Sequence, residues 1–335
     1  MKYDLFGLGN ALVDYEFHTT DALLDELAIE KGLTTLIDPE RADLVLNTMI
    51  QRQGNPSKAC GGSGANSVIA AAAMGSKTFY AAQLGNDENG HFYVADMQNA
   101  GVDTQAQEHM VEGVTGRCFV MVTPDAERTM NTSLGVTGDL AQHSLDPEVI
   151  QNSRAIYMEG YLITSDVSRA TAIKAKQMAQ DAGLMVMGTF SDPGLTQYFK
   201  PQLQELFAGG VDLLFCNEEE LQIFTDTDSL DAGLEAIKPW AKDVIVTLGE
   251  AGALIVQNGE QTRVAGQTAH AVDTNGAGDA FAGAFVHGLM SGWDYIDCAT
   301  FGCQVAARVV ETFGPRLQLA EYDQLRRTFA GQLTN

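Results

Sequence analysis

Residues 273–283 place a carboxylate beside a run of small residues, where a helix is expected to begin. Asp279 directly follows Gly276, Ala277 and Gly278 in the stretch DTNGAGDAFAG. The first N–H groups of a helix have no intrahelical acceptor, and small side chains leave them open to an anion. An anion site beside a carboxylate that can accept a proton suits the transfer of a phosphoryl group to a hydroxyl. Alone, so short a motif more often marks an ordinary helix start.

Two further stretches fit the same chemistry, although each also has a plain structural interpretation. Asn217 and Glu220 follow a strand-like run and would lie in the first turn of a helix. Glu220 could hold Mg²⁺ through water there, but acids at this position also complement the helix dipole. Thr247, Gly249 and Gly252 end another strand in a turn. Such a turn suits backbone contact with nucleotide phosphates, and it is equally typical of a simple hairpin.

Two charged residues near the N-terminal half could contact a substrate. Asp14 follows the first strand-like run and has two acceptor oxygens, which suits paired sugar hydroxyls. Arg128 lies in a predicted hairpin, from which it could reach a phosphate across a cleft. A turn-forming acid and a solvated surface arginine are the simpler interpretations of the same two residues.

Two common nucleotide-binding motifs are not matched. The residues Gly75-Ser76-Lys77-Thr78 lack the glycine that a P-loop has immediately before its lysine. The run Gly7-Leu8-Gly9 resembles the start of a dinucleotide fingerprint, but Leu12 stands where the third glycine belongs. An oxidoreductase with a dinucleotide cofactor is therefore a poor interpretation.

Composition narrows the class of protein further. The chain has 335 residues with 45% hydrophobic content, enough for a substantial core, and a formal net charge of −24. That charge makes nucleic acid and anionic membranes improbable partners. Five scattered cysteines without a CxxC pair argue against a zinc site or a disulfide framework. Together with the absence of a signal-peptide pattern and of a membrane-span run, they predict a cytoplasmic protein.

Strand-like and helix-like segments alternate along most of the chain, which predicts a mostly parallel sheet with helices on both faces. Expected strands cover residues 3–9, 33–37, 77–84, 155–158, 184–189, 211–216 and 243–248. Expected helices cover residues 21–27, 39–50, 68–75, 89–100, 165–183, 196–208, 218–224, 277–292 and 296–310. Residues 117–122 and 129–131 alternate with period two and predict a hairpin around a turn at 124–126. We expect one α/β domain, residues 1–335, with a small β lid from residues 10–38 and 105–134.

Together these features resemble the ribokinase (PfkB) family of carbohydrate and nucleoside kinases, in the expected order across essentially the whole chain. Residues 273–283 are similar to the family's C-terminal motif, and Gly61-Gly62 with Asn66 to its N-terminal Gly-Gly motif. Asn217 with Glu220 is similar to its metal- and phosphate-associated motif. The resemblance implies a ribokinase-like fold and ATP-dependent phosphorylation of a sugar hydroxyl.

The resemblance also implies roles for individual residues. Asp279 would be the base, with the anion site at residues 276–279 and Arg128 meeting the transferred phosphate. The acceptor would contact Asn10, Leu12, Asp14, Gly61, Gly62, Asn66, Tyr161 and Asp279. The nucleotide would contact Asn217, Thr247, Gly249, Gly252, Asn275, Gly276 and Gly278. Glu220 would hold Mg²⁺ through water, and Asp273 with the backbone near Gly314 would hold K⁺.

Within the family, the adenosine kinase branch gives the best likeness. Residues 6–14 (FGLGNALVD) resemble that branch's opening, and 47 positions separate Asp14 from Gly61. The branch brings aromatic side chains to the base from the segment that reads Tyr161-Leu162 here, so one aromatic is missing. Adenosine is therefore the first predicted acceptor and a free sugar the alternative. A non-catalytic sensor on the same fold is the other alternative, and the protein would be a monomer or a lid-mediated homodimer.

The implied mechanism has the lid close over the acceptor and exclude water. Asp279 would accept the hydroxyl proton late, because a loose phosphoryl-transfer transition state needs little prior deprotonation. We also expect the helix dipole to lower the pKa of Asp279 and to keep its side chain ionised.

Overall fold

The computed structural model describes residues 1–125 and 127–333, and its main body is built on a nine-stranded sheet. The strand order is β14-β13-β12-β11-β10-β9-β1-β5-β6. All neighbours from β12 to β6 pair in parallel, whereas β13 and β14 form an antiparallel edge. The strands are β1 (Tyr3–Leu8), β5 (Thr78–Ala81), β6 (Val102–Asp103), β9 (Ser153–Met158), β10 (Met185–Thr189), β11 (Val211–Asn217), β12 (Ala241–Thr247), β13 (Ala253–Gln257) and β14 (Glu260–Val264).

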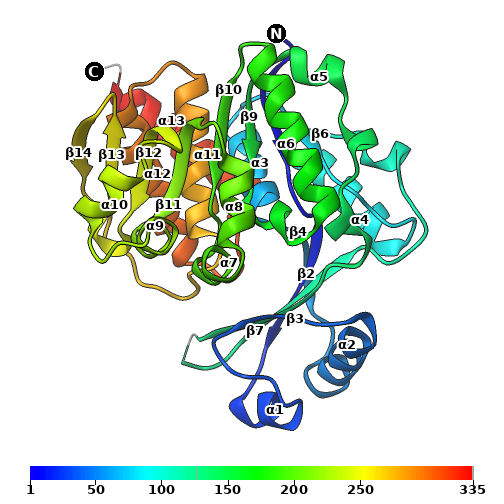
Figure 1. The fold of residues 1–335 in the computed structure, drawn as a ribbon. Coiled ribbons are helices and arrows are strands. Elements are labelled where there is room, and N and C mark those ends of the chain that lie inside the picture. Colours follow the sequence, from blue (N-terminus) through cyan, green and yellow to red (C-terminus); the bar gives the residue numbers. More distant parts are fainter. Residues whose placement is uncertain (126, 334–335) are drawn as a thin grey trace.

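Helices cover both faces of this sheet (Figure 1). One face carries α3 (Ser63–Ala73), α4 (Glu88–Asn99), α11 (Ala277–Met290), α12 (Tyr295–Val310) and α13 (Leu319–Leu333). The other carries α5 (Pro147–Gln151), α6 (Asp166–Asp181), α7 (Pro193–Tyr198), α8 (Lys200–Phe207), α9 (Glu218–Thr225) and α10 (Leu230–Ala236). Short 3₁₀ helices are η1 (Ala106–Glu108), η2 (Gly135–Asp139), η3 (Gln142–Ser144), η4 (Gly160–Thr164) and η5 (Gly249–Ala251).

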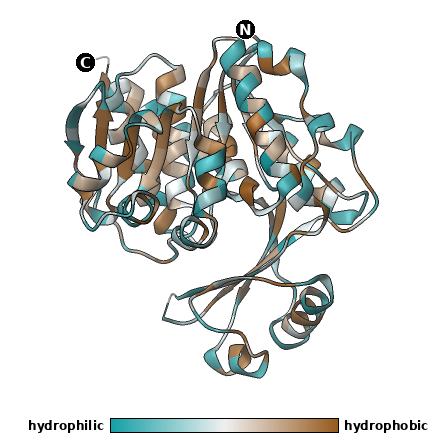
Figure 2. Ribbon diagram, in the orientation of Figure 1, coloured by the Kyte–Doolittle hydropathy of each residue, from teal (hydrophilic) through white to brown (hydrophobic). Residues whose placement is uncertain are grey.

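Alternating strand residues supply the two cores on either side of the sheet. Leu5 of β1 packs in the core under α3 and α11, and its neighbour Phe6 packs in the core under α6 and α8. Because both faces are covered, the parallel strands are mostly apolar, and brown and tan predominate along several of them in Figure 2. This explains why their sequences read as continuous hydrophobic runs.

A second, five-stranded sheet, called the lid below, projects from the body away from both chain termini (Figure 1). Its order is β3-β8-β7-β2-β4. Its elements and the two helices beside it are β2 (Leu12–His18), α1 (Asp21–Glu26), β3 (Thr34–Leu36), α2 (Pro39–Gln53), β4 (Ser57–Gly61), β7 (Gly116–Val122) and β8 (Arg128–Ser133). β7 and β8 form the predicted antiparallel hairpin. Residue 126 of its predicted turn lies outside the described residues.

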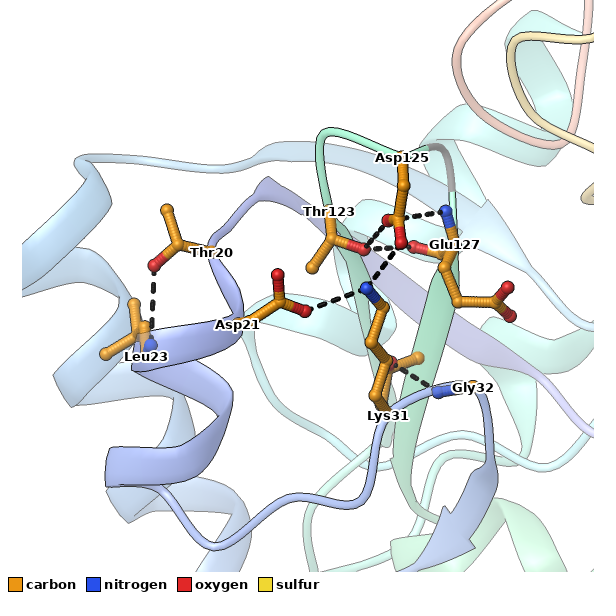
Figure 3. Close-up of polar contacts among 9 residues, drawn as sticks. Thr20, Asp21, Leu23, Lys31, Gly32, Thr123, Asp125 and Glu127 are labelled. Atoms are coloured by element: carbon orange, nitrogen blue, oxygen red, sulfur yellow. Dashed lines mark hydrogen bonds and ion pairs between the residues drawn. The ribbon is translucent and has the colours of Figure 1, made fainter.

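The tip of the lid is held by one lysine (Figure 3). Lys31 lies 2.7 Å from the Asp21 carboxylate at the start of α1 and 2.6 Å from Asp125 in the β7–β8 turn. Asp125 also accepts a hydrogen bond from Thr123 Oγ1 at 2.6 Å. Lys31 and Thr123 together hold the pKa of Asp125 well below its usual range. These contacts connect α1 with the hairpin, so the lid tip forms one unit.

Sequence periodicity missed several elements. Asp14 lies within β2 and not in a loop after β1, and β4 lies outside the two segments expected for the lid. The expected helix 196–208 is two helices, because Pro201 starts α8 and interrupts α7 before it. The β13–β14 hairpin was not expected at all.

The expected fold class is confirmed. The structure has the predicted mostly parallel sheet with surrounding helices and a small second sheet. All five cysteines are free and buried. Among the described residues, no helix combines the length and the apolar character that crossing a membrane requires.

Candidate active site

A cleft of about 770 Å³ lies where the carboxyl ends of the large sheet face the lid. Ligands of open α/β sheets bind at this edge, at the strand where the connections change direction. That strand is β1, which lies between β5 and β9. From the body the cleft is lined by Asn10 after β1, Glu159 after β9 and Thr247 at the end of β12. From the lid it is lined by Leu12, Leu36, Val120, Met130 and Thr132.

The start of α11 forms an open cradle of backbone N–H groups at the floor of the cleft. Gly276 is the N-cap with φ of 72°, a left-handed conformation that favours glycine. A Cβ on Gly276 would lie 2.2 Å from the Pro315 carbonyl oxygen, so no larger residue fits. Ala280 N makes the helical bond to Gly276 O at 2.8 Å, and the N–H groups before it have no helical acceptor. A Cβ at Gly278 would meet no atom within 4 Å, so the space above the cradle is open.

Asp279 lies beside this cradle and contacts the Gly-Gly segment. Its Oδ1 accepts a hydrogen bond from Ser63 Oγ at 2.6 Å, and its Oδ2 accepts one from Asn66 Nδ2 at 3.1 Å. Burial raises the pKa of Asp279 to about 6, although Ser63, Asn66 and Arg128 oppose the rise. The expected lowering by the helix dipole is wrong, because desolvation outweighs the favourable dipole and hydrogen bonds. The carboxylate is still largely ionised at neutral pH.

The residues predicted to bind the acceptor converge on the same point. Asn10, Asp14, Gly62 and Asn66 line the cleft together with Asp279. Gly61 does not line it, but a Cβ at Gly61 would lie 2.2 Å from both carboxylate oxygens of Asp14. Gly61 therefore allows the Asp14 carboxylate to sit against the backbone of β4.

Asp14 is buried, and its electrostatic surroundings are mixed. Burial and the neighbouring carboxylate of Glu16 raise the pKa of Asp14 to about 8, whereas Arg316 lowers it. Arg316 is held by Asp96 at 3.0 Å and donates to Cys60 Sγ at 3.4 Å. The Arg316 guanidinium is thus a fixed positive charge near the Asp14 carboxylate.

Asp14 should make the ligand-free protein less stable at alkaline pH. Its pKa is raised above an unfolded value near 4, so the stability it contributes is complete below pH ~4 and is lost as the pH rises through 8. We expect the melting temperature of Asp14→Asn to fall less between pH 5 and pH 8.5 than that of the wild type. A difference of about 2 °C or more is expected, measured by calorimetry without substrate. An equal fall in the melting temperatures of both proteins would contradict a raised pKa of Asp14.

Of the seven residues predicted to contact the nucleotide, five line the cleft and two do not. Asn217, Thr247, Asn275, Gly276 and Gly278 line it. Gly249 and Gly252 do not, since they form the β12–β13 hairpin turn. A Cβ on Gly252 would lie 2.1 Å from the Val264 carbonyl oxygen, so backbone packing accounts for this glycine.

Asn217 and Glu220 form a capping box at the start of α9. Asn217 N donates to Glu220 Oε2 at 2.8 Å, and Glu220 N donates to Asn217 Oδ1 at 2.8 Å. Burial raises the pKa of Glu220 to about 8, with Asp192 and Asp279 as nearby carboxylates. Both side chains line the cleft, so the capping role and contact with a ligand are compatible.

Arg128 extends from the lid to the body. Its Nη1 lies 3.5 Å from Asp273 Oδ1, and it lines the cleft. Asp273 and Gly314 do not line the cleft. Asp273 accepts hydrogen bonds from Asn275 N at 2.9 Å and Gly314 N at 3.1 Å, which join the loop before α11 to the loop after α12.

The Tyr161-Leu162 segment differs from its sequence interpretation in one respect. Tyr161 lines the cleft, as expected. Leu162 is fully buried in the core beneath α6, so it does not face the cleft at all. An aromatic residue at position 162 would therefore pack in the core in this conformation.

Sequence reasoning missed Glu159, Ser63 and Arg316 as site residues. Glu159 is fully buried and lines the cleft, and burial raises its pKa to about 7. Its position directly after the buried run 155–158 is the signal that could have revealed it, because ligand-binding side chains gather at strand ends. Arg316 has no comparable signal, since only the tertiary fold brings it to Asp96.

Comparison with known proteins places this site in a family. The model of the pfkB family of carbohydrate kinases matches residues 32–321. The chain belongs to the PfkB family of carbohydrate kinases. It is therefore a phosphotransferase with an alcohol group as acceptor, in the class of nucleoside and sugar kinases.

The similarity to individual relatives extends over nearly the whole chain. The crystal structure of adenosine kinase from Sinorhizobium meliloti superimposes with a TM-score of 0.89 at 32% identity, over 98% of this chain and 99% of that one. A probable sugar kinase from Rhizobium etli gives 0.90 at 30% identity, over 98% and 99%. The adenosine kinase of Saccharomyces cerevisiae is 27% identical over 94% of this chain and 97% of its own. The ribokinase-like fold is thus confirmed.

Proposed function

We propose that this kinase transfers the γ-phosphate of ATP to a primary hydroxyl of a ribose-containing nucleoside, with adenosine as its first acceptor. The position of Asp279 carries the proposal. It adjoins the open N–H cradle at the start of α11 and is hydrogen-bonded to Ser63 and Asn66 of the Gly-Gly segment. A base, an anion site and acceptor-binding residues therefore meet at one point.

The proposed transfer uses these groups together. The acceptor, whose ribose Asp14 and Asn66 would hold, gives the proton of its primary hydroxyl to Asp279 as that oxygen bonds to the γ-phosphorus and ADP leaves. The N–H groups at the start of α11 hold the phosphate oxygens, and Arg128 supplies positive charge from the lid. Closure of the lid excludes water, which would otherwise compete as the acceptor. A pKa near 6 leaves Asp279 ionised at neutral pH and close enough to neutrality to accept a proton.

Mg²⁺ fits this cleft in its usual mode, with one or two carboxylates and the phosphates of the substrate. Glu220 and Asn217 would hold it, directly or through water. Among residues 1–125 and 127–333, no cluster of three or more His, Cys, Asp or Glu side chains could hold a metal alone. When bound, Mg²⁺ would neutralise phosphate charge in a strongly acidic protein.

The Asp273 carboxylate accepts one backbone hydrogen bond at each oxygen, and the Arg128 guanidinium lies 3.5 Å away. Each oxygen keeps a further lone pair, so Asp273 and the backbone near Gly314 would hold K⁺. No step of the transfer passes through that ion.

A nucleoside is preferred over a free sugar because part of the cleft is apolar. The lid side is lined by Leu12, Leu36, Val120, Met130 and Leu134. A ribose held at Asp14 would leave this surface uncovered, whereas a base attached to it would bury apolar area. The likeness to adenosine kinases over nearly the whole chain supports this choice. The equal likeness to a probable sugar kinase keeps a free sugar as the second candidate.

Turnover with a panel of acceptors tests the proposal. ADP release is measured with Mg·ATP and adenosine, inosine, ribose or fructose. A kcat/KM for adenosine far above those of the sugars is the expected result. Turnover with a free sugar alone would overturn the nucleoside proposal, and ATP binding without any turnover would favour the sensor alternative.

Leu36 should contribute to nucleoside binding from the lid. It is 54% exposed in the open cleft, so a polar replacement should not disturb folding. We expect Leu36→Ser to raise the KM for adenosine about tenfold, the effect of losing one buried leucine contact, and to leave the KM for ATP unchanged. Leu44→Ser is the matched control, since Leu44 is 53% exposed on α2 and does not line the cleft. Equal KM values for the two variants would contradict an apolar base site.

A further inference from the structure

Glu159 is a buried carboxylate that the transfer step does not use. It is fully buried, yet its two oxygens accept backbone hydrogen bonds from different segments. Asn10 N donates to Oε1 at 2.6 Å, and Gly64 N donates to Oε2 at 2.5 Å. Asn10 lies far before Glu159 in the chain, and Gly64 lies at the start of α3.

These two segments are two of the places where the chain passes between body and lid. Asn10 lies between β1 of the large sheet and β2 of the lid sheet, and Gly64 follows β4 of the lid sheet. Figure 1 shows β2 and β4 in the narrow neck between the two parts. Each crossing also carries acceptor-binding residues, Asn10 and Asp14 on one and Gly62 and Asn66 on the other.

The backbone around Glu159 is shaped to admit the carboxylate. A Cβ on Gly9 would lie 2.5 Å from Glu159 Oε2, and a Cβ on Gly64 would lie 2.8 Å from it. Both glycines therefore let the main chain approach the side chain closely. Asn10 is fixed a second time, because its Nδ2 donates to the Tyr161 carbonyl oxygen at 3.2 Å.

We infer that Glu159 is a positioning residue that fixes two of the body–lid crossings, at Asn10 and at Gly64, and so sets the geometry of the acceptor site. It acts through Asn10 and the Gly62–Gly64 turn and does not touch the reacting atoms. A charged acceptor for two N–H groups is stronger than a neutral one and leaves neither donor unpaired. The effect on acceptor affinity rests on the proposed function, whereas the effect on the backbone does not.

The test compares Glu159→Gln with a matched control at a third crossing. Asp87 also accepts two backbone hydrogen bonds, from Gly90 N at 2.8 Å and from Thr115 N at 2.9 Å, just before β7. Neither Asp87 nor Thr115 lines the cleft. For both variants of the full-length protein we would measure melting temperature, KM for adenosine and for ATP, kcat, and hydrogen–deuterium exchange of the backbone.

Glu159→Gln is expected to raise the KM for adenosine about 10- to 100-fold, with a much smaller change in the KM for ATP. Exchange at Asn10 and Gly64 should quicken at least tenfold, while Asp87→Asn should quicken exchange near Thr115 only. If Glu159→Gln does not fold, the same measurements would be made on Glu159→Asp, which keeps the charge on a shorter side chain. Equal stability losses in the two variants, with the adenosine KM and exchange at Asn10 and Gly64 unchanged, would overturn the inference. If the wild type fails to phosphorylate adenosine, the proposed function fails, and the exchange result alone decides the role of Glu159.

Discussion

Replacing Asp279 by Asn is expected to lower kcat about 10²–10⁴-fold, the contribution of a positioned general base. The variant cannot accept the hydroxyl proton, but it has nearly the same size and shape. Its amide can still accept from Ser63 Oγ, and it can donate to Asn66 Oδ1, a buried atom that has no partner among residues 1–125 and 127–333. Folding and ATP affinity should therefore remain close to the wild-type values.

Steady-state kinetics and ATP titration by calorimetry measure both parts of this prediction. Asp192→Asn is a suitable control, because Asp192 lines the same cleft and caps α7 through Leu195 N. Its turnover should stay close to that of the wild type. Substantial turnover by Asp279→Asn would remove Asp279 from the role of base.

Replacing each of two glycines of the cradle by Ala should have different effects on stability and on activity. Gly276→Ala places a Cβ 2.2 Å from the Pro315 carbonyl oxygen at a φ of 72°. The left-handed conformation alone costs about 1–2 kcal/mol for a non-glycine residue, and the clash adds to it. We expect a clear loss of thermal stability. Turnover should also slow by about a hundredfold or more, because the cradle N–H groups are displaced.

Gly278→Ala should behave in the opposite way in the unfolding experiment. Its Cβ would meet no atom within 4 Å, and alanine favours a helix more than glycine does. The melting temperature should be unchanged or higher. The KM for ATP should rise, because the methyl group points into the space above the cradle. Equal melting temperatures for the two variants would show that Gly276 is not constrained as described.

The sequence predicted the body of the fold well because its parallel strands are buried on both faces. Runs such as 213–216 are apolar and are followed by a polar residue, so both their type and their ends are visible. The lid was harder to predict. β4 reads Ser-Lys-Ala-Cys-Gly, with little strand character of its own, and forms because β2 offers it an edge.

Some residues of the candidate site could likewise be predicted from the sequence, and others could not. Asp279, Asn66 and Asp14 lie in motifs that reveal them, and the structure places all three at one cleft. The direction of the Asp279 pKa shift could not be predicted, because a local helix dipole is visible in sequence and burial is not. Glu159 had one local signal, its position directly after the buried run 155–158. Arg316 contacts Asp96, which is distant in the chain, and no local pattern signals that contact.

Single-turnover transfer from ATP labelled at the γ-phosphate tests the central claim most directly. Enzyme, Mg²⁺, labelled ATP and adenosine would be mixed, and the products separated for the wild type and for Asp279→Asn. We predict that the wild type moves the label to the primary hydroxyl of adenosine and that the variant leaves it on ATP. Label found only as inorganic phosphate, or equal transfer by both proteins, would contradict an acceptor site organised around Asp279.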